Sequence, residues 1–206
     1  MISCKDARWL LVTFAFATLA VSVGCKRDPS SARVTLPQGW SLVSADELDG
    51  ARREQMKLAD SARAELATRL MQRVAQVSQA DGFSAAVEVC HGEAPKIAAE
   101  VAAKHRVAIG RTSSRLRNPS NLAPVWSEAL FNEPGEPAIA VGPHGEFGVV
   151  HPIVLGELCA NCHGAADKLA PGVAEILTQR YPDDRATGYA PGELRGWFWV
   201  EVPKSR

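Results

Sequence analysis

The sequence predicts an α+β fold in which an antiparallel sheet is flanked by helices. Two long helical segments come first, at 46–80 and 83–104, and short strand candidates follow them. The strand candidates are 106–113, 138–142, 147–154 and 194–202. The chain shows no internal repeat and no regular alternation of strands with helices, which favours α+β over a parallel α/β sheet.

The first 25 residues have the pattern of an export signal. Lys5 and Arg8 precede an apolar run from Trp9 to Gly24, and polar residues follow. The run ends in Val-Ser-Val-Gly-Cys25, which resembles a bacterial lipobox, where the cysteine is cut free and lipidated. A plain secretory signal and an uncleaved anchor are the alternatives. In each case we expect a periplasmic protein, held at a bacterial membrane where Cys25 is lipidated.

Residues 26–45 are predicted to be a linker, because Pro29, Pro37 and Gly39 interrupt them. Residues 46–203 then form one domain of ordinary size. The chain carries 23 basic and 23 acidic side chains, and this balance indicates no nucleic-acid partner. No second apolar segment is long enough to cross a bilayer.

The segment 46–80 is predicted to be an amphipathic helix rich in Ala, Leu, Arg and Glu. Such a helix either covers a sheet or pairs with a copy of itself, so a homodimer is one of two expectations. Its methionines, Met56 and Met71, fit best as fillers of an apolar face.

The second helix, 83–104, carries a buried stripe that includes Val87, Cys90 and Ala94. His91 lies about 100° further around the helix. Pro95 withdraws the amide that would bond the carbonyl of His91, so we expect a kink or restart at this point.

The strand candidates show the expected alternation and turn chemistry. The Gly142-Pro143-His144-Gly145 stretch predicts a hairpin turn between 138–142 and 147–154. In the last strand one face carries Phe198, Val200 and Val202, and the other carries Trp197, Trp199 and Glu201.

Three cysteines remain outside the export signal, namely Cys90, Cys159 and Cys162. An odd number cannot all form disulfides, and a leftover thiol in an oxidising compartment indicates a metal, a haem or a catalytic role. Cys159-x-x-Cys162-His163 is the attachment pattern of c-type haem. Its spacing lets two thiols bond one haem edge while the histidine reaches the iron, so we expect one covalent haem c per chain.

Other interpretations of this motif are a thioredoxin-like dithiol, a structural disulfide, or half of a zinc site. A zinc site would combine Cys90, Cys159, Cys162 and His163 into a Cys3His set.

The motif does not specify the second axial ligand of the iron. The methionines and the histidines are candidates, and helix geometry favours Cys90 over its neighbour His91. His105, His144 and His151 are weaker candidates, since His144 lies on a turn and His151 precedes a proline within a strand.

Arg111, Arg115 and Arg117 lie in one basic segment, GRTSSRLRNPSN. A guanidinium suits a haem propionate, so Arg111 and Arg117 are candidate propionate partners. A solvated basic loop is the alternative, and the sequence does not separate the two.

Several further motifs occur along the chain. They are VC-x-x-x-AP (Cys90, Ala94, Pro95), IGRTS (109–113), RNP-x-N (117–121), CANCHG (159–164) and YPDDRATGY-x-x-GELRG (181–196). Together they resemble a bacterial family of haem c domains that was long catalogued as a domain of unknown function. The resemblance covers about residues 45–203. It departs from the family pattern at Ser127, which stands where an acidic residue is expected after Trp126.

The resemblance implies a PAS-like antiparallel sheet with long N-terminal helices and a single covalent haem c. It also implies iron held by a histidine of the attachment motif and a cysteine of the helix, which here are His163 and Cys90. Tyr181, Arg185 and Tyr189 would line the haem edge by the same resemblance. Members occur alone or as the sensory part of membrane histidine kinases and cyclase-type signalling proteins.

A thiolate opposite a histidine favours ferric iron, so we expect a low-potential centre in redox or electron-transfer service. Two filled axial positions argue against a peroxidase or another enzyme, and no catalytic residue is predicted. The alternative is a sensor of redox state, nitric oxide or carbon monoxide that acts through a partner. The partner is thus expected to be a redox or signalling protein that the sequence does not identify.

Overall fold

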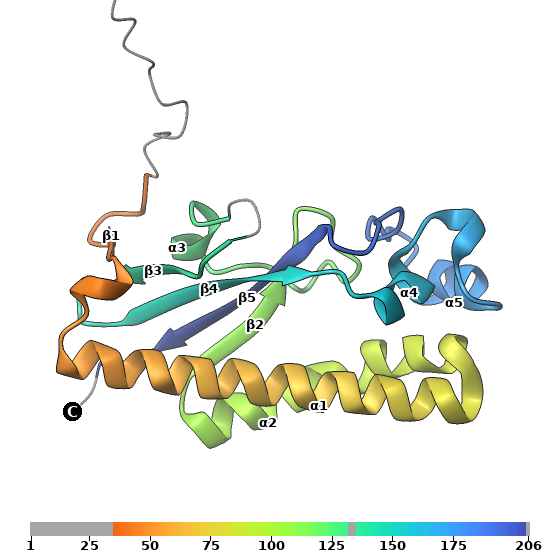
Figure 1. Cartoon of the computed structure of the whole chain (residues 1–206), viewed down its shortest axis with the longest axis horizontal. Helices are drawn as coiled ribbons and strands as arrows, with labels where there is room; N and C mark the ends of the chain where they lie inside the picture. The colour runs from red at the N-terminus through yellow and green to blue at the C-terminus, as the bar shows by residue number, and fades with distance from the viewer. Residues whose placement is uncertain (1–34, 132–134, 205–206) are drawn as a thin grey trace, which may run out of the picture. The chain divides into compact units, whose positions relative to one another are not determined.

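The computed structural model describes residues 35–131 and 135–204, and these contain an α+β domain (Figure 1). The predicted signal peptide with Cys25 and residues 26–34 of the predicted linker lie outside the described residues. Within the described residues, no helix has the length and apolar character needed to cross a membrane.

Five antiparallel strands form one sheet in the order β1-β3-β4-β5-β2. Their bounds are Ser41–Leu42 for β1, Ala108–Thr112 for β2, Ala138–Val141 for β3, Phe147–Val154 for β4 and Leu194–Val202 for β5. The predicted α+β class and the four predicted strands are confirmed. The short strand β1, which pairs with β3, lies inside the segment that the sequence indicated as a linker.

Helix α1, Gly50–Glu88, is capped at its N-terminus by Asp49, whose carboxylate accepts a hydrogen bond from the amide of Arg52 at 2.8 Å. The helix is interrupted at Gly82, where a φ of 86° requires glycine. The chain turns back there (Figure 1), so the two predicted helices form a hairpin. A π-helical turn, Val89–Glu93, then leads into α2, Ala94–His105.

Helices α1 and α2 cover one face of the sheet (Figure 1). The core between them contains Leu66, Val101, Phe147, Val149 and Val200, all fully buried. Burial of each such side chain stabilises the fold by about 1.5 to 3 kcal/mol.

The opposite face of the sheet carries a second, aromatic cluster around α3, Val125–Glu128. Trp126 stacks on Trp40 with ring centroids 4.8 Å apart, and its indole N–H donates to Glu201 at 2.6 Å. Trp197 belongs to this cluster, whereas Phe198 and Val200 belong to the first one. The predicted two-faced pattern of the last strand is therefore confirmed.

The remaining helices are α4, Ala160–His163, and α5, Val173–Arg180, which lie at the same end of the sheet as the α1 turn (Figure 1). The predicted hairpin joins β3 to β4, with the amide of Gly142 donating to Glu146 at 2.8 Å. The far end of β4 is irregular, because the pairing with β5 shifts between Ile153 and Val154. This irregular end leads directly into the attachment motif.

Candidate haem site

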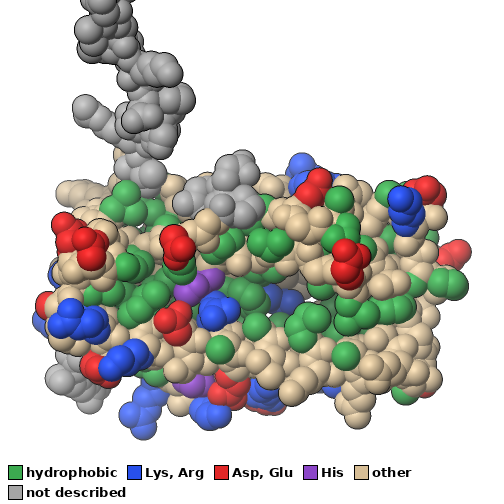
Figure 2. Space-filling view, in the orientation of Figure 1, with side chains coloured by type: hydrophobic (Ala, Val, Ile, Leu, Met, Phe, Trp, Pro, Cys, Tyr) green, Lys and Arg blue, Asp and Glu red, His purple; other side chains and the backbone are tan. Residues whose placement is uncertain are grey.

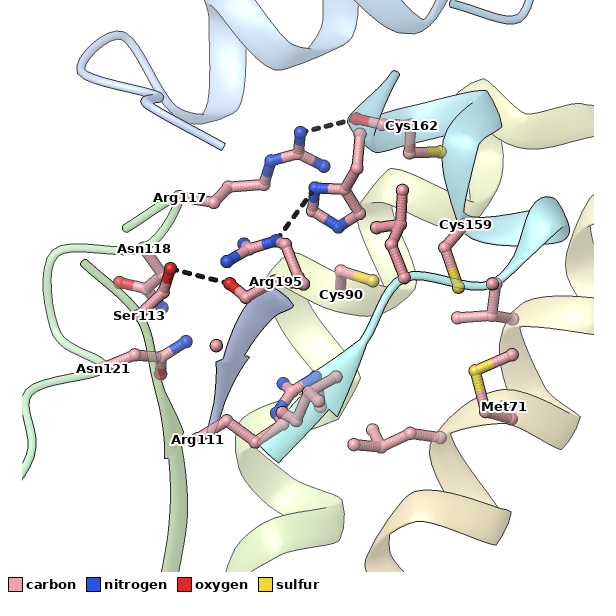
Figure 3. A pocket seen from close by; sticks show the side chains of 18 of the residues that line it. Met71, Cys90, Arg111, Ser113, Arg117, Asn118, Asn121, Cys159, Cys162 and Arg195 are labelled. Atoms are coloured by element: carbon pink, nitrogen blue, oxygen red, sulfur yellow. Dashed lines mark hydrogen bonds between the residues drawn. The ribbon is translucent and has the colours of Figure 1, made fainter. Parts of the chain in front are cut away.

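A cavity of about 460 Å³ lies between α1, the π-helical turn, the ends of β2 and β5, and the segment 153–163. Figure 2 shows a hollow above α1, bordered by hydrophobic side chains. Most of the lining is apolar, but three cysteines, one histidine and three arginines also reach it (Figure 3). These are Cys90, Cys159, Cys162, His163, Arg111, Arg117 and Arg195.

The attachment motif forms a compact helical turn on the cavity wall. Cys159 ends a 3-10 turn that starts at Glu157, and α4 follows at once with Cys162 and His163. Burial raises the pKa of the Cys162 thiol to about 11. Cys159, Cys162 and His163 all line the cavity, so the structure brings the whole motif to one surface.

The geometry does not support two of the competing interpretations of the motif, a disulfide and a zinc site. Cys90, Cys159 and Cys162 are free thiols in the structure, so no disulfide links them. Across residues 35–131 and 135–204, no three His, Cys, Asp or Glu side chains converge closely enough to hold a metal ion. The predicted Cys3His zinc set is therefore not assembled.

His163 is held in the tautomer that a haem ligand needs. Its Nδ1 lies 2.7 Å from the carbonyl oxygen of Ala186, which can only accept a hydrogen bond. Nδ1 therefore carries the proton, and Nε2 keeps its lone pair. Burial holds the pKa of His163 well below its usual range, and the charges of Arg117 and Arg195 act in the same direction. The imidazole is thus neutral and able to bind iron.

Arg117 holds the attachment turn against the loop 184–186. Its Nη2 donates to the carbonyl oxygen of Cys162 at 2.6 Å and lies 3.1 Å from the carboxylate of Asp184. Both side chains are about nine-tenths buried. Asp184 also accepts from the amide of Ala186 at 2.8 Å, which fixes the carbonyl that orients His163. The guanidinium of Arg117 therefore already has two partners within the protein, Cys162 and Asp184.

Arg111 differs from Arg117 because its guanidinium has no hydrogen bond or ion pair with any residue that the structure describes. It lines the cavity from β2 (Figure 3). Burial lowers the pKa of Arg111 below its ordinary value, which reports the unfavourable desolvation of a charge without a counter-ion. Among the arginines predicted to meet propionates, Arg111 is the one left with free donors facing the cavity.

Cys90 reaches the cavity from the π-helical turn Val89–Glu93. The amide of Ala94 bonds the carbonyl of Val89, and Pro95 has no amide to offer His91. The predicted irregularity of this helix is thus confirmed as a π-turn. Burial raises the pKa of Cys90, and the charges of Arg111, Arg117 and Arg195 oppose that shift.

His91 is exposed and lies edge-on to Tyr181, with ring centroids 5.3 Å apart, and it does not line the cavity. The structure therefore brings Cys90, and not His91, into the same cavity as His163.

The other candidate ligands lie elsewhere or at the rim. His105 is 2.8 Å from Glu65, His151 is 3.5 Å from Asp60, and His144 is exposed on the hairpin. Met56 packs against the main core. Met71 lines the cavity but is 45% exposed.

The aromatic residues suggested by the resemblance take different places. Tyr181 lines the cavity, and burial raises its pKa to about 12. Tyr189 instead packs under Arg115, whose guanidinium carbon is 4.2 Å from the ring centre. Arg185 is exposed. Ser127 is buried in α3 and donates to the carbonyl of Pro124 at 2.8 Å, outside the cavity.

Two features of the site were not predicted from the sequence. Arg195 lies beside His163, and the carbonyl of Ala186 sets the histidine tautomer. A backbone carbonyl has no sequence signature, and the LRG stretch that contains Arg195 carries no signal beyond its place in the family motif.

Comparison with known proteins bears on the family and on the fold. The sequence profile of the Tll0287-like family matches residues 44–203. A solved structure titled "Crystal structure of the cyanobacterial heme-protein Tll0287" aligns with a TM-score of 0.56 and 20% sequence identity. The alignment covers 74% of this chain and 97% of that chain, and it shows a shared fold. No curated protein matches the chain.

Proposed function

The chain belongs to the Tll0287-like family, and from this premise we propose that it is a c-type haem protein in low-potential electron transfer. One haem c per chain would be attached through Cys159 and Cys162. His163 and Cys90 would hold the iron from its two sides, with His91 as the alternative to Cys90. The related solved structure is titled a heme-protein, which supports the proposal. The PAS-like assignment of the fold belongs to the same proposal.

One observation carries the proposal most directly. Cys90 opens into the same cavity as His163, although 73 residues of sequence separate them (163 − 90 = 73). A structural dithiol would not require a third thiol in the same cavity. The haem iron of an electron carrier takes a second axial ligand, and the Cys90 thiol would supply one beside the neutral imidazole of His163.

The charges around the cavity also fit a haem. Among the described residues, Arg111, Arg117 and Arg195 line it and no acidic side chain does. Asp184 neutralises Arg117, so two positive charges remain. A ferric porphyrin with a bound thiolate and two ionised propionates carries two net negative charges. Such a group would therefore compensate the buried arginines, and the unpaired Arg111 is its most direct partner.

Bound haem supplies one-electron transfer at its iron. The chain provides a mostly apolar lining, the neutral imidazole of His163 and the thiol of Cys90. A thiolate ligand favours the ferric state and gives a low reduction potential. Because Cys90 and His163 would both hold the iron, oxygen activation would be suppressed, so we propose an electron carrier rather than an enzyme such as a peroxidase.

A redox or gas sensor is the second candidate, and the π-turn is the observation that favours it. Cys90 lies on an irregular turn at the junction of α1 and α2. Arg180 pairs with Glu88 and Arg73 pairs with Glu93, both at 2.7 Å, on either side of the turn. Loss of Cys90 from iron, through reduction or binding of nitric oxide or carbon monoxide, would release this turn and move α2. Such a sensor would signal through a partner protein.

We further propose that the protein is periplasmic and lipid-anchored through Cys25. This part of the proposal rests on the sequence pattern of residues 1–25 alone. A redox or signalling protein would be the functional partner, and self-pairing through α1 stays a prediction.

Covalent haem attachment tests the function. The protein is expressed with c-type haem maturation proteins, denatured, and assayed for haem that stays with the chain on a gel. We expect one haem per chain, and loss of attachment in the Cys159→Ser, Cys162→Ser double variant. A wild-type protein without covalent haem under these conditions would refute the proposal.

A further inference from the structure

Arg195 lies against the ring nitrogen of His163 that already contacts Ala186. Its Nε is 3.3 Å from Nδ1, and the Ala186 oxygen is 2.7 Å from the same atom. Both neighbours cannot be hydrogen-bonded at once. Nδ1 donates its proton to the shorter contact, so it has no lone pair to accept the Arg195 N–H. A cation is therefore placed beside an imidazole N–H without a hydrogen bond between them.

Arg195 is fixed there by other groups. Its Nη1 is 3.4 Å from the carbonyl oxygen of Arg115, and its guanidinium lies over the ring of Tyr189, 5.4 Å from the ring centre. It forms no ion pair with a carboxylate in the part of the chain that the structure describes. Asp184 forms its ion pair with Arg117. Burial lowers the pKa of Arg195 below its ordinary value. An arginine held in this way has an electrostatic effect on His163 rather than a structural bond to it.

We propose that Arg195 is a positioning residue that raises the reduction potential of the haem centre by acting through His163. The inference rests on the proposed function. Donation from Nδ1 to the Ala186 carbonyl shifts electron density onto the imidazole, strengthens it as a ligand to ferric iron and lowers the potential. The Arg195 charge beside the same nitrogen opposes that shift and favours the reduced centre. The two contacts act in opposite directions on one ligand.

The test measures the midpoint potential of the haem-loaded protein and three variants at Arg195. Arg195→Leu removes the charge and the polar contacts, Arg195→Gln keeps a donor without charge, and Arg195→Lys keeps the charge. We expect Leu and Gln to favour the ferric form by a factor of ten or more, a fall of about 59 mV for one electron. Lys should stay within a factor of three of the wild type.

Arg185→Leu is the matched control, because Arg185 also lies near Ala186 in sequence but is exposed to solvent. Its potential should stay at the wild-type value, since solvent screens an exposed charge.

Two results would overturn the inference: a wild-type potential in Arg195→Gln, or an equal fall in Arg195→Lys and Arg195→Leu. Either would mean that the charge of Arg195 does not set the potential. Haem content is measured first on every sample. Absence of covalent haem in the wild type would refute the proposed function, whereas normal haem with an unchanged potential would refute only the role of Arg195.

Discussion

The guanidinium of Arg117 lies 3.1 Å from the carboxylate of Asp184 and donates to the carbonyl of Cys162 at 2.6 Å. This buried pair joins the segment after β2 to the loop that orients His163. The pairing of Arg117 with Asp184 was not predicted from the sequence.

Removal of one partner of this pair should strongly destabilise the fold, because it leaves the other charge buried and unpaired. We expect Arg117→Leu to lower the free energy of unfolding by about 3 to 5 kcal/mol, measured by urea denaturation. The double variant Arg117→Leu, Asp184→Leu should recover part of that loss.

Arg180→Leu is the control for this prediction. Arg180 pairs with Glu88 at 2.7 Å, but both side chains are more than two-fifths exposed. The cost should be below about 1 kcal/mol. Equal costs for Arg117→Leu and Arg180→Leu would contradict the structural role assigned to the buried pair.

Arg111→Leu should have opposite effects on the haem-free and haem-loaded proteins. Without haem, Arg111 is a partly buried charge with no partner among the described residues, so its removal should stabilise the fold by about 1 to 3 kcal/mol. With haem attached, the same change removes a partner of a propionate and should destabilise by a similar amount. Urea denaturation measures both free energies of unfolding. The haem-loaded protein keeps the attachment cysteines, and the haem-free protein lacks Cys159 and Cys162. The same sign in the two backgrounds would count against the propionate role.

The pKa of His151 is lowered to about 4, chiefly by burial, and Arg63 adds to the shift. Asp60 faces the same ring at 3.5 Å, and Nε2 of His151 makes no hydrogen bond with a residue that the structure describes. The unfolded chain therefore takes up a proton at a higher pH than the folded one. Stability should be fully present above about pH 6.5 and should fall by about 3 kcal/mol as the pH drops towards 4.

His151→Gln should remove most of this pH dependence, as measured by urea denaturation at pH 7 and pH 4.5. His144→Gln is the control, because His144 is exposed on the hairpin. A pH profile that His151→Gln leaves unchanged would show that other groups dominate acid destabilisation.

An electron carrier should keep both axial ligands when the iron is reduced. We therefore expect the dithionite-reduced protein to stay six-coordinate and to bind carbon monoxide slowly or not at all, followed by absorption spectroscopy. Rapid carbon monoxide binding after reduction would instead favour the sensor, in which Cys90 leaves the iron and releases the π-turn.

Features with a local period were predictable from the sequence. The alternation of Phe198, Val200 and Val202 marked one face of the last strand. The buried face predicted for the second helix included Cys90 and left out His91. The spacing of Cys159, Cys162 and His163 fixed a single turn. These patterns follow from strand and helix geometry, which acts over a few residues.

Features that depend on distant segments were not predictable. The contact of His163 with Ala186 spans 23 residues, and that of Arg117 with Asp184 spans 67. Loop residues reach such partners through the tertiary fold, so no local period reports them. Trp40 was likewise hidden in the expected linker, because a two-residue strand and one aromatic stack leave almost no sequence pattern.

The most direct test of the haem centre is the electron paramagnetic resonance spectrum of ferric Cys90→Ala, compared with His91→Ala and the wild type. We predict covalent haem in all three, a low-spin thiolate signature in the wild type and His91→Ala, and loss of that signature in Cys90→Ala alone. A wild-type spectrum in Cys90→Ala, or a spectrum altered only in His91→Ala, would contradict ligation by Cys90.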